Sequence, residues 1–155
     1  MARIWTVVCG AGFLTFVAIQ FIRPAISHPP ATADLAAPAE VKQILRTSCY
    51  DCHSNETRLA WFDQIAPAYW MVAKDVEGGR SQLNFSEIGK LLPAQRKAVL
   101  YEAVNQLQLG AMPLPAYTLL HRAAVVNEAH GRNGRIPGPL KSVQAVKIGG
   151  QADNS

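Results

Sequence analysis

The feature that most constrains this chain is an almost uninterrupted apolar run near its N-terminus, from Ile4 to Ile22. Arg3 precedes the run, Arg23 follows it, and the run itself contains no charged residue. A helix over these residues is roughly 28 Å long, which is close to the hydrocarbon thickness of a bilayer. We therefore expect residues 1–23 to form a transmembrane anchor or a signal segment.

A cleaved signal peptide is the alternative to an anchor. Ala31-Thr32-Ala33 has the small-x-small form of a cleavage site. The apolar run is long for a signal peptide, however, and Arg23-Pro24 and Pro29-Pro30 separate it from that site. We therefore favour an uncleaved anchor, with the N-terminus inside and the rest of the chain outside.

The remainder of the chain has the length of one modest domain. Residues 24–37 are rich in Pro and Ala, which is typical of an extended tether. We expect a folded domain over residues 38–130 and a flexible C-terminal tail over residues 131–155. Of the 15 basic residues, Arg3 and Arg23 flank the apolar run, and the remaining 13 face 11 acidic ones without forming a polybasic stripe. Nucleic acid is therefore not an expected partner.

The domain is predicted to be all-α, because its apolar residues recur at helical spacing and no strand series is present. Gly78-Gly79 and Gly110 are interpreted as helix ends, and Pro93 as a helix start. Met112-Pro113 cannot continue a helix. The expected helices cover residues 38–49, 63–77, a short turn after 84–86, 93–109 and 117–128.

Cys49, Cys52 and His53 form the motif with the most specific chemistry. They lie at i, i+3 and i+4, so a helical turn places all three on one side. Cys-x-x-Cys-His is the signature of c-type haem attachment, in which the two sulfurs form thioethers with the porphyrin and the imidazole binds the iron. The sequence thus predicts one covalent haem c, with His53 as an iron ligand.

A disulfide, a redox dithiol and half of a zinc site are the alternatives for two cysteines at this spacing. A zinc site needs two more ligands, but the third cysteine, Cys9, lies in the apolar run. His121 and His130 are spaced more widely than the usual ligand pair. A thioredoxin-like dithiol calls for a βαβ context, which a helical chain lacks. Haem attachment is therefore the interpretation that we favour.

The residues around the motif extend it into a longer pattern. The pattern comprises Cys49-Tyr-Asp-Cys-His-Ser-Asn-Glu-Thr57, Trp61-Phe62, Ile65-Ala-Pro67, Trp70, Asp75, Gly79-Arg80, Leu83-Asn84-Phe85-Ser86, Met112-Pro113, Tyr117 and His121. Over about residues 19–128 it resembles the small haem-binding domain family. The resemblance implies an exported, cytochrome c-like helical domain around one covalent haem, preceded by a membrane segment. Ala60 and Ile88 depart from the proline and tryptophan that are usual in the family.

The sixth iron ligand is predicted to be Met112. Pro113 keeps Met112 out of the α region and removes the next backbone donor, so the thioether lies on a rigid segment that can face the haem. A core-filling role for Met112 is one alternative. His121 is the alternative ligand, and it predicts a bis-histidine centre of lower reduction potential than a Met–His centre.

Three more residues are candidates for contacts with the haem. Trp61 and Trp70 can pack against the porphyrin or close the core. Arg80 can pair with a haem propionate, because guanidinium and carboxylate groups match bidentately. Ordinary core packing of the tryptophans and a solvated turn at Arg80 are the alternatives.

These patterns predict a c-type cytochrome that passes single electrons between redox partner proteins and is not an enzyme. We place it in the bacterial inner membrane with the haem domain in the periplasm, or free in the periplasm if the N-terminal segment is cleaved. A haem-based gas or redox sensor, or a small peroxidase, is the alternative function and requires an open or displaceable sixth position. A thiol oxidoreductase that uses Cys49 and Cys52 is a third possibility.

Overall fold

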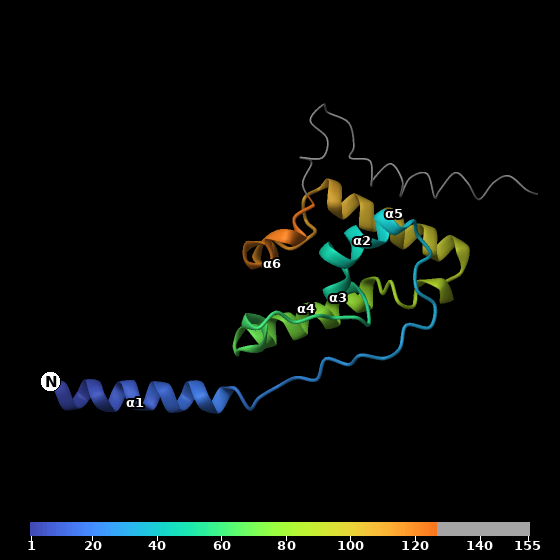
Figure 1. Ribbon diagram of the computed structural model, residues 1–155. Coiled ribbons are helices and arrows are strands. Elements are labelled where there is room, and N and C mark those ends of the chain that lie inside the picture. Colours follow the sequence, from blue (N-terminus) through green and yellow to red (C-terminus); the bar gives the residue numbers. More distant parts are fainter. Residues whose placement is uncertain (127–155) are drawn as a thin grey trace, which may run out of the picture.

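The computed structural model describes residues 1–126. Within this part the chain is helical and contains no strand (Figure 1), so the all-α prediction is confirmed there. The predicted tail, 131–155, and the last predicted domain residues lie outside the described part. The elements are α1 (Ala2–Ile19), α2 (Ala39–Ser48), α3 (Tyr50–His53), η1 (Phe62–Gln64), α4 (Ala68–Gln82), η2 (Ile88–Lys90), α5 (Pro93–Gln108), α6 (Pro115–Leu120) and η3 (Arg122–Ala124).

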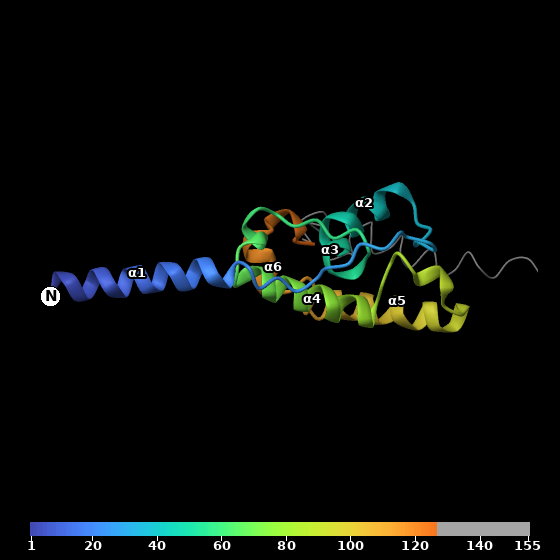
Figure 2. The same ribbon diagram turned by 90° about the horizontal axis from the view of Figure 1, so that it is seen from below.

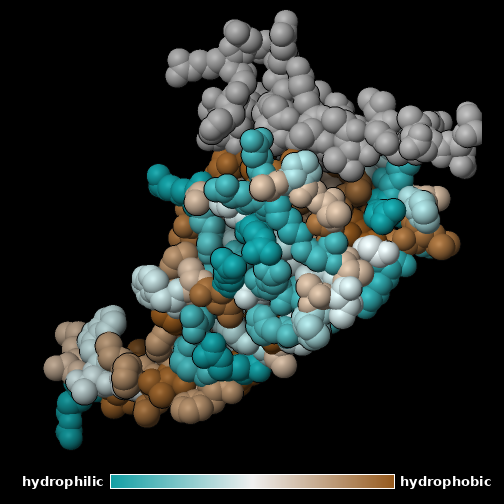
Figure 3. Space-filling view, turned by 45° about the vertical axis from the view of Figure 1, so that its right-hand side comes forward, coloured by the Kyte–Doolittle hydropathy of each residue, from teal (hydrophilic) through white to brown (hydrophobic). Residues whose placement is uncertain are grey.

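Helix α1 extends away from the domain, and none of its residues is buried (Figures 1 and 2). It is long and apolar enough to cross a membrane, a property that a signal segment at the N-terminus shares. In the space-filling view, α1 at the lower left is largely hydrophobic, whereas the domain face in view is largely hydrophilic (Figure 3). Most of the apolar run is therefore one exposed helix, and the run bonds to the domain only at its end, through Gln20 and Ile22.

Residues 24–37 are extended but do not hang free of the domain. The N–H groups of Ala33 and Leu35 donate to the carbonyls of Ser86 (3.1 Å) and Phe85 (2.9 Å). The Tyr69 hydroxyl donates to the Pro24 carbonyl at 2.7 Å. The segment that the sequence assigned to a tether thus lies along the domain, fixed by its own backbone.

Asp34 is the centre of a polar cluster that fixes this segment to α2 and α3. Its carboxylate accepts hydrogen bonds from the Lys42 ammonium, the Tyr50 hydroxyl (2.8 Å) and the Leu35 N–H (3.0 Å). Desolvation by itself raises the pKa of Asp34, but the bonds from Lys42 and Tyr50 and the charge of Lys42 outweigh it and lower the pKa. The carboxylate therefore stays ionised at neutral pH, where it makes these bonds.

The core centres on Tyr50, Phe85 and Ile88, which are almost completely buried. The rings of Tyr50 and Phe85 stack with their centroids 5.4 Å apart. Partly buried residues that pack against this cluster are Leu35, Leu45, Cys49, Leu83, Leu91, Val99 and Leu100. The core thus joins the N-terminal segment, α2, α3 and the middle of α5 immediately beside the cysteine motif.

Helix α4 differs from the predicted helix over 63–77 at both ends. It begins at Ala68, after Pro67, and it continues through Gly78-Gly79 to Gln82. A Cβ placed on Gly79 would lie 2.6 Å from the Cys52 carbonyl oxygen, closer than van der Waals contact allows. Gly79 therefore serves the close packing of α4 on α3, and not the end of a helix. Gly110, with a φ of 66°, does follow the end of α5, as predicted.

We expect Gly79→Ala to destabilise the domain by about 1–3 kcal/mol, because the added methyl group must displace the Cys52 backbone. Gly78→Ala is the matched control, since it lies in the same helix and a Cβ there meets nothing within 4 Å. The control is expected to be neutral or stabilising by up to about 1 kcal/mol. Thermal unfolding measures both, and equal unfolding temperatures for the two variants would contradict the close approach.

Candidate functional site

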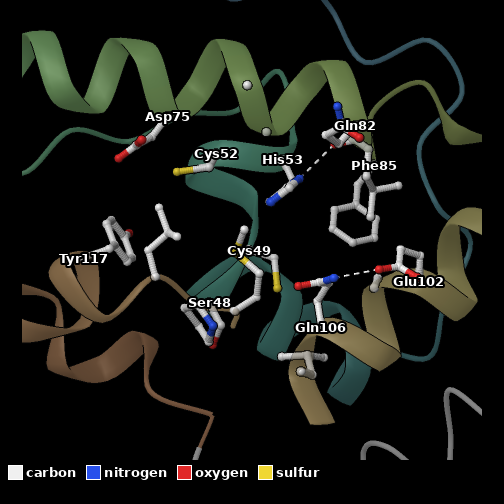
Figure 4. A pocket seen from close by; sticks show the side chains of 18 of the residues that line it. Ser48, Cys49, Cys52, His53, Asp75, Gln82, Phe85, Glu102, Gln106 and Tyr117 are labelled. Carbon is white, nitrogen blue, oxygen red and sulfur yellow. Dashed lines mark hydrogen bonds between the residues drawn. The ribbon is translucent and has the colours of Figure 1, made fainter. Parts of the chain in front are cut away.

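A cavity of about 670 Å³ lies between α3, α4, α5 and the segment that precedes α6 (Figure 4). This volume is within the range of small-molecule and cofactor pockets, roughly 300–1,000 Å³. Cys49, Cys52, His53 and Met112 all line it. The structure thus brings together the two cysteines and both predicted iron ligands, from segments about sixty residues apart in sequence.

The cysteine motif forms a helical turn at the junction of α2 and α3. The N–H groups of Cys52 (3.2 Å) and His53 (2.9 Å) both donate to the Cys49 carbonyl. Figure 4 shows both thiols and the imidazole at the cavity wall. The i, i+3, i+4 spacing therefore does place the three side chains on one side, as the sequence predicts.

His53 is held by the segment that follows α4. Its Nδ1 lies 3.1 Å from the Leu83 carbonyl oxygen, and a carbonyl only accepts, so Nδ1 carries the proton and donates it. The Phe85 N–H donates to the His53 carbonyl at 2.8 Å. The other nitrogen, Nε2, keeps its lone pair, which is the arrangement of a metal-binding histidine whose ring is oriented by a second hydrogen bond.

Burial raises the pKa of the Cys49 thiol to about 11. Burial, followed by the nearby charge of Asp75, raises the pKa of the Cys52 thiol to about 12. Both thiols are therefore protonated at neutral pH. A nucleophilic dithiol requires the opposite, a thiol pKa lowered by nearby positive charge or a helix N-terminus.

Helix α5 faces the cavity with its apolar stripe. Val99, Ala103 and Leu107, at i, i+4 and i+8, line the cavity, and no residue of α5 is buried. An apolar wall in so small a domain needs packing partners, because protein interiors are close-packed and small cores have little area to spare. A flat apolar ligand would supply those partners, so the volume, apolar lining and donor set of the cavity suit a porphyrin.

Met112, which precedes α6, and Tyr117, which lies in α6, also line the cavity. The Tyr117 hydroxyl donates to the Asp51 carboxylate at 2.6 Å. Burial and this hydrogen bond raise the pKa of Tyr117, so it remains a donor at neutral pH. The bond ties α6, and the Met112-Pro113 segment just before it, to the turn that carries Cys52.

His121 is not brought to the cavity. Its Nε2 lies 2.9 Å from the Asp63 carboxylate, and its Nδ1 lies 3.1 Å from the Tyr117 carbonyl. Its ring also stacks on the Tyr117 ring, with centroids 4.0 Å apart. Both nitrogens are thus engaged within the domain, and neither is directed at the residues of the cysteine motif.

Trp61, Trp70 and Arg80 also lie away from the cavity. Trp61 is 75% exposed. The Trp70 indole N–H donates to the Ile22 carbonyl at 2.6 Å, and the Arg80 guanidinium donates to the Ser27 carbonyl at 2.7 Å. Trp70 and Arg80 therefore hold the N-terminal segment on the domain, and the structure gives neither of them a contact with the cavity.

Some cavity residues were not among the predicted site residues, although Asp75 belongs to the pattern that resembles the family. Asp75 of α4 and the hydrogen-bonded pair Gln106 and Glu102 of α5 (2.6 Å) are among them (Figure 4). Burial raises the pKa of Asp75. The i, i+4 spacing of Glu102 and Gln106 was a visible signal for their mutual bond, but nothing local indicates that they face a ligand.

A helical domain around a cavity that presents two thiols and an oriented imidazole is suited to hold a metal-containing cofactor. A family model of the haem-binding domain matches residues 14–133. The chain therefore belongs to the haem-binding domain family and is a haem protein. Comparisons with curated proteins and with solved structures found no match.

We expect Tyr117→Phe to cost about 1–2 kcal/mol of unfolding free energy, because the variant leaves the Asp51 carboxylate without this donor while keeping the aromatic ring. It should also change the absorption spectrum of the haem, since the bond positions the Met112 segment. Tyr69→Phe is the control, because it loses one hydroxyl bond of similar length far from the cavity. An identical spectral change in both variants would show that the bond to Asp51 has no special role.

Proposed function

We propose that this protein is a membrane-anchored c-type cytochrome that transfers single electrons outside the cytoplasm. The observation that carries the proposal is the convergence of Cys49, Cys52, His53 and Met112 on one cavity in a chain of the haem-binding family. When bound, the haem supplies an iron centre that cycles between ferric and ferrous forms by one electron. The chain's own residues hold that centre, set its potential and limit its access to water.

Cys49 and Cys52 attach the porphyrin in this proposal. Each S–H would add across one vinyl double bond of the haem, so that a carbon–sulfur bond would form and the thiol hydrogen would pass to the neighbouring vinyl carbon. The addition is balanced and requires no oxidant. The burial of both thiols at the cavity wall supports attachment over a dithiol redox role, because a dithiol with raised pKa values is a poor nucleophile at neutral pH.

His53 and Met112 are the residues that would hold the iron of the haem in this proposal. The Leu83 carbonyl fixes the His53 ring so that Nε2 is free to bind iron, and the Tyr117 bond to Asp51 holds the Met112 side of the cavity. Ligation by His121 through Nε2 requires it to give up its bond to the Asp63 carboxylate and to move to the cavity, which it does not line. A sensor or peroxidase requires an open sixth position, and Met112 at the cavity wall favours electron transfer instead.

Hydrogen bonds between the domain and residues 22–27 support an uncleaved anchor. Cleavage after Ala33 removes the backbone partners of Tyr69, Trp70 and Arg80 at Pro24, Ile22 and Ser27. Three domain side chains then lose hydrogen bonds that the intact chain satisfies. These contacts support retention of α1. We propose that it stays in the bacterial inner membrane, with the domain in the periplasm and redox proteins as partners.

Covalent attachment is tested with the double variant Cys49→Ala/Cys52→Ala. Wild-type protein is expected to keep its haem on a denaturing gel and after extraction with acidified organic solvent, because thioethers survive both treatments. The double variant is expected to lose it. Cys9→Ala is the control and should behave as wild type, and haem retained by the double variant would refute covalent attachment through this motif.

Axial ligation is tested by comparing Met112→Ala with His121→Ala. We expect Met112→Ala to abolish the weak long-wavelength band of a sulfur-to-ferric-iron bond and to lower the reduction potential by more than about 100 mV. His121→Ala should change neither. The reverse pattern would assign the sixth position to His121, and a broad high-spin spectrum of the wild type would favour the sensor or peroxidase.

A further inference from the structure

The end of the domain nearest α1 carries exposed apolar side chains that the haem cavity does not use. We call this set the end patch, and it comprises Phe21, Ile22, Trp61, Ile65, Leu119 and Leu120. Apolar side chains that gather on one end of a domain mark an interaction surface more often than scattered ones do. Side-chain hydrogen bonds of Gln20 and His121 bring these segments together.

Gln20 joins the end of α1 directly to the turn that carries Trp61 and Ile65. Its side-chain amide accepts from the Ala66 N–H at 2.8 Å and donates to the Ala66 carbonyl at 3.3 Å. The Ile65 N–H donates to the Phe62 carbonyl, which closes this turn around η1. The turn is therefore fixed one residue beyond the last residue of α1, without an intervening spacer.

The end of α6 lies beside the same turn. His121 bonds to Asp63 at 2.9 Å, and its ring lies 5.0 Å from the Phe62 ring. Leu119 and Leu120 immediately precede His121. Both ribbon views show α6 and the turn before α4 at the end of the domain next to α1 (Figures 1 and 2).

We propose that the end patch rests in the interfacial layer of the bilayer that α1 enters, so that lipid is its partner. The proposal rests on the membrane-anchored cytochrome proposed above. With 18 residues, α1 is about 27 Å long, so a spanning α1 ends at the interface and carries the attached turn to that level. Tryptophan favours this layer because its ring is apolar and its N–H is polar.

Charge at the same end suits lipid headgroups. Arg23 follows the patch residues Phe21 and Ile22, and its guanidinium lies 4.3 Å from the centre of the Tyr69 ring. A cation placed there is close to phosphate oxygens while the aliphatic stem covers apolar surface. The docked end holds the haem cavity at one height and one orientation above the membrane.

The test uses the haem-loaded full chain in nanodiscs of phosphatidylcholine and phosphatidylglycerol that contain a phospholipid with a photoactivatable diazirine near its glycerol. After illumination, mass spectrometry locates the labelled peptides. We expect label in α1 and in the peptides that contain 58–66 and 116–121, and none at the start of α5. Trp61→Ser/Ile65→Ser should lower the label in 58–66 at least about fivefold, with the haem spectrum unchanged.

Leu92→Ser is the matched control, because Leu92 is an exposed leucine at the start of α5, at the other end of the domain. It should change nothing. Label confined to α1 would overturn the proposal that the end patch contacts lipid, but it would leave α1 as a membrane anchor. A chemical cross-link that joins two copies through residues 58–66 would overturn the same proposal. An N-terminus found beyond residue 23 by mass overturns the anchor as well, whereas the haem spectrum reports on the cytochrome assignment independently.

Discussion

The hydrogen bond from the His53 imidazole to the Leu83 carbonyl is the interaction on which the site depends. It exists because α4 ends at Gln82, so that the Leu83 carbonyl, in extended backbone, has no helical partner and is free to accept. This single hydrogen bond to the backbone thereby fixes the tautomer and the ring orientation of His53, the proposed proximal ligand, and leaves its Nε2 free. The position at which α4 ends therefore determines how the His53 ring is oriented.

The cavity explains why the protein part of the core is so small. Tyr50, Phe85 and Ile88 fill one side of the motif, whereas the apolar residues Val99, Ala103 and Leu107 of α5 line the cavity. A helix with no buried residue gains little from packing on protein alone. We therefore expect the bound cofactor to stabilise this domain, so that haem binding and folding are linked.

Much of this arrangement follows from local sequence. The cysteine motif, the helical class, the bounds of α5 between Pro93 and Gly110, and the place of Met112 at the cavity are all visible as patterns. The extent of α4 was not, because a Gly-Gly pair is equally compatible with a helix end and with a close helix contact, and only the position of Cys52 decides between them. The role of Arg80 could not be predicted either, because its partner Ser27 lies 53 residues away and no local pattern connects the two.

The contact at Gly79 has a consequence for the evolution and redesign of this domain. Because the Cys52 carbonyl and the α4 backbone meet directly there, the spacing of the two walls is set by main chain. Side-chain substitutions can change the lining of the cavity, but they cannot change the distance between α3 and α4 at this contact. A bulkier macrocycle, or a deeper burial of the same one, requires α4 itself to shift, and that shift carries the Leu83 carbonyl away from His53. Cofactor size and ligand orientation are therefore not independently adjustable in this architecture.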